Sequence, residues 1–246
     1  RFPEAAEKEE NGRQVAVIRM ITRLIFIWFM REKGLVPGDL FNKKVITECL
    51  TDLDDNSSSY YLAILQNLFF TTLNTPMDKR QFRSNLKGFK GHNPDFGNQY
   101  KYRHQALIAQ PERVEEFFAN IPFLNGGLFT CLDVRKSNGN PDIQEIFIDG
   151  FTENKKNQVF VPNELFFGGE RNIDLNAIYN TKEQSYRVRG LLNIFSEFNF
   201  TIDENTPDDQ DIALDPELLG HVFENLLARV NPETSEQARR ETGSFY

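Results

Sequence analysis

The sequence predicts a mainly α fold, an irregular helical domain with one or two small β-hairpins in its middle. Two long runs, 14–33 and 58–74, repeat apolar residues at helical spacing. Between 143 and 162, short β-favouring runs alternate with turn residues. The chain has 246 residues, of which 39% are hydrophobic, so it can bury a sizeable core.

The run 14–33 is expected to form one long, mostly buried helix. Its most apolar stretch, 25–30, lies between Arg23 and Arg31, which leaves too few uncharged residues for a membrane span. Gly34 stands where a helix-terminating glycine belongs, and Pro37 prevents continuation. No contact with a membrane is therefore expected.

The run 58–74 predicts a second long helix, with Ser57 or Ser58 as its N-cap. Asn-Gly-Gly in "IPFLNGGLF", 121–129, allows the chain to reverse and return both flanks to one core. We divide the chain into a first helical part, 1–120, and a second part with the small hairpins, 121–246. The other predicted elements are helices over 111–120, 185–200 and 215–228, and strands over 143–149 and 157–162.

Charge and cysteine content limit the function classes. The net charge of -8 argues against a small protein that depends on nonspecific nucleic-acid contacts, although a local basic face remains compatible with it. Cys49 and Cys131 lie far apart without a CxxC spacing, so neither a disulfide framework nor a zinc ribbon is expected. A reduced, cytoplasmic location is the simple interpretation.

A basic, aromatic-rich segment spans 76–104 and contains Phe82, Tyr100 and Tyr102. Its cations are candidates for contacts with a DNA backbone, because Lys and Arg bind phosphates and aromatic rings stack on bases. The alternative is a solvated face whose aromatic rings belong to the core. The candidate cations are Lys79, Arg80, Arg83, Lys87, Lys90, Lys101 and Arg103.

Several motifs resemble catalytic or metal sites without their full pattern. Pro141 and Asp142, with Glu153-Asn154-Lys155, match the spacing of a metal-dependent nuclease, yet both pieces lie in turn-like sequence. "NPDF", 93–96, lacks the second proline of a methyltransferase NPP[YF] motif, and "DLDDNSSS" lacks the glycine and closing glutamate of a calcium loop. His92, His104 and His221 are scattered, and His221 is expected at a surface. We therefore expect no catalytic residue and no metal site.

The C-terminal part resembles a known family. "ALDPELLGHVFENLLA", 213–228, followed after a spacer by "ARRETGSFY", 238–246, is similar to type IIG (Eco57I-like) restriction-modification proteins. In that family a similar helix precedes TGS[FY]YTP, which opens an adenine-N6 DNA methyltransferase domain. "RLIFIWFMREKGLVP", 23–37, and "IPFLNGGLF" fit the helical connector of the same family. The resemblance spans most of the chain, and it is specific at both ends and looser in the middle.

The resemblance implies a connector between a nuclease domain and a methyltransferase domain, with no complete active site of its own. We expect the sequence to continue beyond both ends, with the glycine-rich cofactor loop and the true NPP[YF] after residue 246. The parent would be an enzyme that methylates adenine in DNA with S-adenosylmethionine and cleaves DNA with Mg. The cofactor-binding residues present would be Thr242, Gly243, Ser244, Phe245 and Tyr246. The partners would be the flanking domains and DNA.

Two other functions remain open at this point. One is a self-contained helical protein-interaction module of a phage-defence complex, which the absence of downstream methyltransferase motifs would favour. The other is a free-standing nuclease, which predicts Mg-dependent cleavage by these residues alone.

Overall fold

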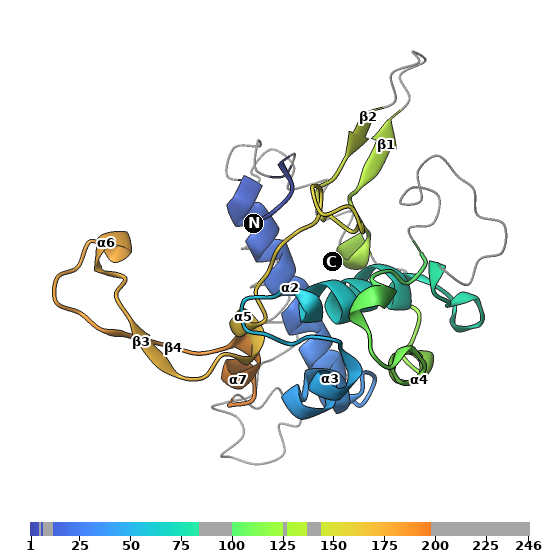
Figure 1. The fold of residues 1–246 in the computed structure, drawn as a ribbon, viewed down its shortest axis with the longest axis horizontal. Helices are drawn as coiled ribbons and strands as arrows, with labels where there is room; N and C mark the ends of the chain where they lie inside the picture. Colours follow the sequence, from blue (N-terminus) through green and yellow to red (C-terminus); the bar gives the residue numbers. More distant parts are fainter. Residues whose placement is uncertain (5, 7–11, 84–99, 125–126, 137–143, 198–246) are drawn as a thin grey trace, which may run out of the picture.

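The computed structural model describes residues 1–4, 6, 12–83, 100–124, 127–136 and 144–197 (Figure 1). The helix and the motifs that the sequence predicts within 84–99 and 198–246 lie outside these residues. The described residues form a mainly helical fold with two small antiparallel hairpins, which confirms the predicted fold class. The predicted helix over 111–120 is confirmed as α4, which has Pro111 in its first turn. The α-helices are α2 (Gly12–Glu32), α3 (Lys43–Cys49), α4 (Pro111–Ala119), α5 (Glu164–Phe167), α6 (Asn176–Tyr179) and α7 (Leu191–Phe195).

Helix α2 confirms the long helix predicted over 14–33. Gly34 ends it with a φ of 69°, a left-handed conformation that glycine adopts without steric cost. The Gly34 amide donates to the Arg31 carbonyl and the Leu35 amide to the Met30 carbonyl, both at 2.9 Å, which is the Schellman pattern. Within the described part of the chain, no helix combines the length and apolarity that a membrane crossing requires.

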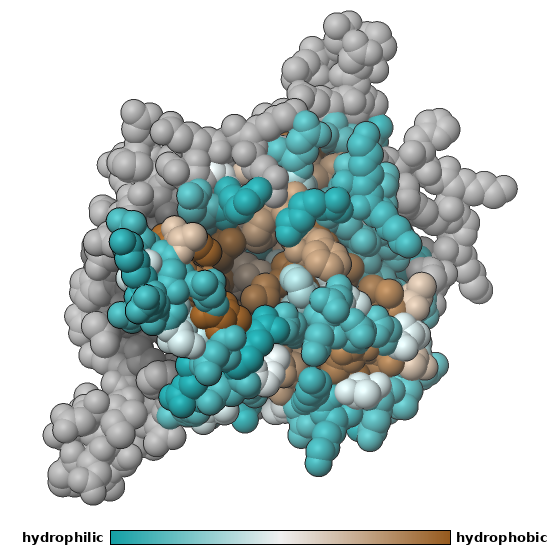
Figure 2. All heavy atoms as spheres, turned by 60° about the vertical axis from the view of Figure 1, so that its left-hand side comes forward, coloured by the Kyte–Doolittle hydropathy of each residue, from teal (hydrophilic) through white to brown (hydrophobic). Residues whose placement is uncertain are grey.

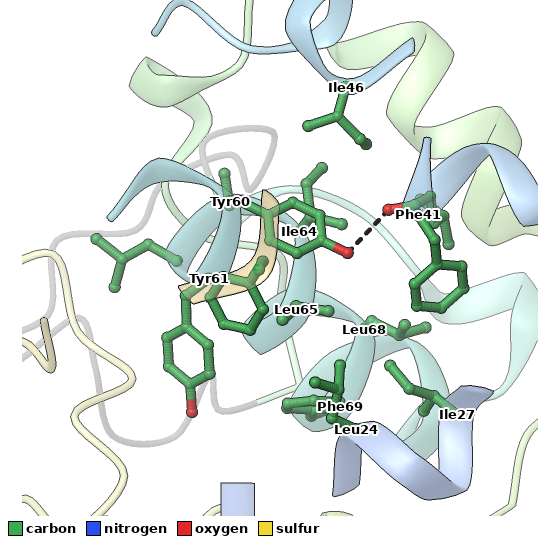
Figure 3. Close-up of a cluster of buried hydrophobic side chains, with 14 of the residues drawn as sticks. Leu24, Ile27, Phe41, Ile46, Tyr60, Tyr61, Ile64, Leu65, Leu68 and Phe69 are labelled. Carbon is green, nitrogen blue, oxygen red and sulfur yellow. Dashed lines mark hydrogen bonds between the residues drawn. The ribbon is translucent and has the colours of Figure 1, made fainter. Parts of the chain in front are cut away.

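The second predicted helix lies at the centre of the fold, and we call residues 60–74 the central helix. It is wound with π geometry over Tyr60–Leu65 and Asn67–Thr71, and with 3-10 geometry over Thr72–Asn74. Every residue from 60 to 73 is buried, so the helix is surrounded by protein on all sides. Figure 3 shows Leu24 and Ile27 of α2 packed beside it.

Polar side chains of the central helix bind the backbone of segments far along the chain. Buried backbone groups need hydrogen-bond partners, and irregular segments cannot supply all of them internally. The side-chain amide of Gln66 donates to the backbone carbonyl of Asp149 at 3.1 Å. The side-chain amide of Asn67 donates to the Arg103 carbonyl at 2.8 Å, and that of Asn74 donates to the Phe129 carbonyl at 2.6 Å. Asn67 Oδ1 also accepts from the Arg103 amide at 2.8 Å.

Asn163 caps the central helix, and the prediction of Ser57 or Ser58 as its cap is therefore wrong. Asn163 Oδ1 accepts from the Tyr60 amide at 3.0 Å, while its Nδ2 donates to the Asp54 carbonyl at 2.8 Å. The Asn163 Nδ2 also donates to the Ser57 hydroxyl, and Ser58 Oγ instead accepts from the Val161 amide. Proximity in sequence predicted the serines, but the tertiary fold brings in a better-placed acceptor.

The first hairpin pairs β1 (Val134–Lys136) with β2 (Gln144–Ile146), so the strand predicted over 143–149 is confirmed in part. The strand predicted over 157–162 is wrong. Phe160 instead exchanges two backbone hydrogen bonds with Arg1, at 2.7 and 2.8 Å. This extended run therefore lies against the start of the chain rather than in a hairpin.

The second hairpin corrects the helix predicted over 185–200. Strands β3 (Arg171–Ile173) and β4 (Tyr186–Val188) pair in an antiparallel arm that projects from the core and carries α6 near its tip (Figure 1). Helix α7 begins only after Gly190. The Gly190 amide donates to the Gly168 carbonyl at 2.9 Å, and a Cβ at 190 would lie 2.4 Å from the Phe166 carbonyl oxygen. This close approach closes the base of the arm.

One hydrophobic core collects residues from Met20 to Phe195, on both sides of residue 120. Ile121 and Phe129 are both buried, so the segments on either side of the Asn-Gly-Gly sequence return to this core as predicted. Several aromatic rings meet edge to face, for example Trp28 with Phe41 at 5.3 Å between ring centres. Figure 2 shows apolar residues set among hydrophilic ones on one face of the molecule.

We predict that Asn163→Ala lowers the free energy of unfolding by about 3 kcal/mol, because it removes a helix cap and leaves buried donors and acceptors without partners. Urea denaturation followed by circular dichroism measures the change. Asn172→Ala, at an exposed position of β3, is the control and should change stability by less than about 0.5 kcal/mol. Equal stability of the two variants would contradict the capping role.

Candidate functional site

The basic segment supplies the candidate site, and the structure places five of its seven predicted cations. Lys79 ends the 3-10 turn Met77–Lys79, and Arg80 and Arg83 follow it. Lys101 and Arg103 return beside them, because the Arg83 amide donates to the Tyr102 carbonyl at 3.0 Å. Lys87 and Lys90 lie outside the described residues.

Arg80 joins the end of α4 to the basic segment. Its guanidinium donates to the carbonyls of Thr75 at 3.0 Å, Phe118 at 2.6 Å and Ile121 at 2.7 Å. Burial lowers the pKa of the Arg80 guanidinium from its ordinary value. The residue satisfies carbonyls at the C-terminus of α4, where a cation is favoured.

The other two arginines of the segment also face protein groups. Arg83 forms an ion pair with Glu153, which also accepts from the His104 amide at 2.9 Å. Arg103 is only 2% exposed, and its guanidinium lies 4.1 Å from the ring centre of Phe151. A cation in this position stabilises the fold through the ring face.

Lys79 and Lys101, the two lysines of the basic segment that the structure describes, lie together at the surface. Lys79 is exposed, and Lys101 donates from Nζ to the Lys79 carbonyl at 2.9 Å. Tyr100, next to Lys101, is 55% exposed, whereas Phe82 and Tyr102 are buried with their ring centres 5.3 Å apart. The structure therefore divides the predicted cluster into a buried aromatic pair and an outer group that we call the lysine patch, Lys79, Tyr100 and Lys101.

His104 follows Arg103 in the chain and has a left-handed backbone conformation, with a φ of 60°. It is 3% exposed, and its Nδ1 lies 3.5 Å from the Gln158 amide nitrogen. Burial, together with the nearby Arg103 and Arg83 charges, lowers the pKa of His104 to about 3. The imidazole is therefore neutral at physiological pH.

A pair of buried carboxylates forms a second polar centre, which the sequence did not reveal. The Asp133 carboxylate accepts from four successive backbone amides, those of residues 148 to 151, at 2.7 to 3.1 Å. Asp149 binds Arg23 Nη1 at 2.8 Å and accepts from the Leu132 amide. Gly150, with a φ of 61°, allows the chain to wrap around the Asp133 carboxylate. This arrangement fixes the base of the β1–β2 hairpin.

The two carboxylates differ in their electrostatics. Burial and the neighbouring Asp149 raise the pKa of Asp133. Burial would also raise the pKa of Asp149, but the charge and hydrogen bonds of Arg23 lower it overall. Arg23 also donates from Nε to the Leu128 carbonyl at 2.8 Å. Arg23 therefore links α2 to the segment before β1 through Leu128 and to the segment after β2 through Asp149.

The remaining motif residues that the structure describes do not assemble with this centre. Glu153 is held by Arg83 and the His104 amide, while Lys155 is exposed. Asp52 and Asp54 accept from backbone amides two residues on, as expected of a polar connector. Within the described ranges, no group of three or more potential metal ligands comes together. His92, His221, Asp142, the "NPDF" motif and Thr242, Gly243, Ser244, Phe245 and Tyr246 lie outside those ranges.

Comparison with known proteins gives one informative similarity. No protein-family model matches the chain, and no solved structure matches it. The chain is 26% identical over 238 residues to a protein of Methanocaldococcus jannaschii named "Putative type II restriction enzyme and methyltransferase". The alignment covers 97% of this chain but 14% of that relative. The chain thus corresponds to a small part of a much longer protein.

We predict that His104 makes the fold less stable in acid. Because its pKa is lower folded than unfolded, the unfolded state binds the proton first, and stability is lost as pH falls from about 6.5 toward 3. Between pH 7 and 5 the loss should be about 2 kcal/mol. Asn tolerates the same backbone conformation, so His104→Asn should flatten the pH dependence measured by urea denaturation. Equal slopes for the two proteins would contradict this role.

Proposed function

We propose that the chain is a non-catalytic helical connector within a type IIG restriction-modification protein. The observation that carries this proposal is the alignment along nearly the whole chain with a small part of a relative named for both activities. The motifs at 213–228 and 238–246 support the same assignment. The parent would transfer a methyl group from S-adenosylmethionine to adenine N6 and cleave DNA with Mg.

The contacts of the described residues support a mechanical role. Arg80 binds carbonyls at the end of α4, and Arg23 pairs with Asp149 across the core. The central helix holds the backbone of distant segments through its amide side chains. Groups engaged in this way maintain geometry, and methyl transfer depends on geometry because the sulfonium and a flipped adenine must be held together.

Within this proposal, Thr242, Gly243, Ser244, Phe245 and Tyr246 would contact the methionine part of S-adenosylmethionine. The glycine-rich loop and the NPP[YF] motif would follow them, and the Mg site would belong to a nuclease domain before residue 1. The connector would fix the distance and orientation between these two domains.

The reading frame around this sequence tests the proposal. We expect the codons after Tyr246 to encode a glycine-rich cofactor loop and then NPP[YF], and the full-length product to transfer labelled methyl groups to adenine in DNA. A stop codon soon after Tyr246 would instead favour a helical interaction module. Methylation or cleavage of DNA by residues 1–246 alone would also contradict the connector role.

We further propose that the lysine patch contacts the DNA backbone in the parent enzyme. Of the five predicted cations that the structure describes, Lys79 is exposed and Lys101 is half-buried with its ammonium on the Lys79 carbonyl, and Tyr100 adds an exposed ring beside them. Phosphate contacts of this kind release counterions and make binding depend on salt.

Lys79→Glu/Lys101→Glu in the full-length enzyme should weaken duplex binding and reduce the slope of log affinity against log salt by about 2. Fluorescence anisotropy over a salt series measures both quantities. The matched control is Lys182→Glu/Arg187→Glu on the exposed arm, which should leave the slope unchanged. An equal effect of the two double variants would contradict the assignment of this patch.

A further inference from the structure

The arm formed by β3, α6 and β4 stands away from the core. No residue from 169 to 189 is buried, and Figure 1 shows the arm extending to one side of the molecule with α6 near its tip. Ile178 and Tyr179 of α6 are 74% and 61% exposed, the largest exposed fractions among the large hydrophobic side chains that the structure describes. Tyrosine is among the residues that most often anchor protein interfaces, so this pair is a candidate contact point.

A hydrogen-bond network fixes this tip without the help of the core. The side-chain amide of Asn176 donates to the Gln184 carbonyl at 2.8 Å, and its oxygen accepts from the Thr181 hydroxyl at 2.8 Å and from the Gln184 backbone amide at 3.1 Å. The Thr181 hydroxyl lies 2.6 Å from the Tyr186 hydroxyl, and the Tyr186 ring centre lies 5.2 Å from that of Tyr179. The tip is therefore presented in a fixed geometry, and such preorganisation lowers the entropic cost of binding.

The charges of the arm favour a protein partner over DNA. Contacts with a phosphate backbone depend on several cations that are free to neutralise it. The three arginines of the arm each pair with a glutamate, namely Arg171 with Glu164, Arg187 with Glu170 and Arg189 with Glu197. The other charged residues between 169 and 190 are two acids and one base, Asp174, Glu183 and Lys182. The apolar tip thus fits an apolar pocket on a protein better than it fits a duplex.

The size of the tip favours a tethered partner over a separate one. Complete burial of an aromatic side chain removes about 150–250 Å² from water. A stable complex between separate proteins buries about 800 Å² on each side, which two side chains do not supply. Within one polypeptide, the effective concentration of a neighbouring domain is in the millimolar range, so a small contact is sufficient.

The base of the arm lies where the chain proceeds toward its later residues. The Gly190 amide closes this base on the Gly168 carbonyl at 2.9 Å, and α7 follows directly. The arm and the sequence after α7 therefore start from the same part of the molecule. The chain aligns with only 14% of its relative, so a protein of that kind has ample further sequence to supply the pocket.

We propose that Ile178 and Tyr179 insert into an apolar, uncharged pocket of the domain that follows residue 246 in the parent polypeptide. The proposal rests on the proposed function, in which that domain is the methyltransferase. The docked arm fixes the orientation of this domain relative to the helical core. It thereby gives the mechanical role of the connector a specific point of contact.

Labelling of a thiol beside the tip tests the docking in the full-length enzyme. Ala177→Cys changes an exposed residue next to the two anchors, and mass spectrometry measures how fast a maleimide modifies it. Adding Ile178→Ser and Tyr179→Ser should raise this rate about tenfold, because the tip is then released. Adding Leu35→Ser and Met77→Ser instead, at 47% and 50% exposed positions outside the arm, is the matched control and should leave the rate unchanged.

Urea denaturation should give the same stability for these variants, since all the changes are at exposed positions. A photoreactive cross-linker attached at position 177 should capture peptides from beyond residue 246. Equal labelling rates with and without the two tip substitutions would overturn the proposal, as would cross-links confined to residues 1–246. Protection of the thiol that rises with protein concentration, or that appears only when DNA is added, would overturn it in favour of a second copy or of DNA.

The outcome separates this proposal from the function on which it rests. An enzyme that methylates adenine but leaves the tip unprotected would overturn the docking alone. A reading frame that stops soon after Tyr246 would overturn both the docking and the connector role.

Discussion

Buried backbone outside regular helices and sheets must still find hydrogen-bond partners, and this constraint organises the fold. The central helix meets it with amide side chains rather than with apolar residues alone. The side chains of Gln66 and Asn67 donate to the carbonyls of Asp149 and Arg103. The side chain of Asn163 accepts from the first amide of the same helix. The core is therefore apolar in bulk and polar at the points where distant segments are fixed.

The same principle separates what could be predicted from what could not. Periodicity and terminal signals are local, so α2 with Gly34 and α4 with Pro111 followed directly from the sequence. The cap at Asn163 and the pairing of Phe160 with Arg1 join residues more than a hundred positions apart. No local pattern encodes such pairs. The helix expected over 185–200 is confirmed only over α7, and its first part is wrong for a related reason, because β4 forms only when β3 lies beside it.

The candidate site shows the same limit for charges. Composition identified the basic segment but could not distinguish Arg80, which donates to four backbone carbonyls, from Lys79, which is exposed. The buried Asp133 was missed because its partners are backbone amides, which carry no sequence signal beyond the glycine at 150. A basic cluster in a sequence can therefore contain fold-stabilising arginines and surface lysines whose roles become separate only in three dimensions.

The central claim is that side-chain amides of the central helix fix irregular backbone as part of one cooperative core. Native-state hydrogen exchange of the Arg103 amide, which donates to Asn67 Oδ1, tests it most directly. The account predicts that this amide exchanges only through global unfolding, with the same free energy as the amides of Leu65 and Leu68. Exchange of the Arg103 amide at a much lower free energy, while the helix amides remain protected, would contradict it.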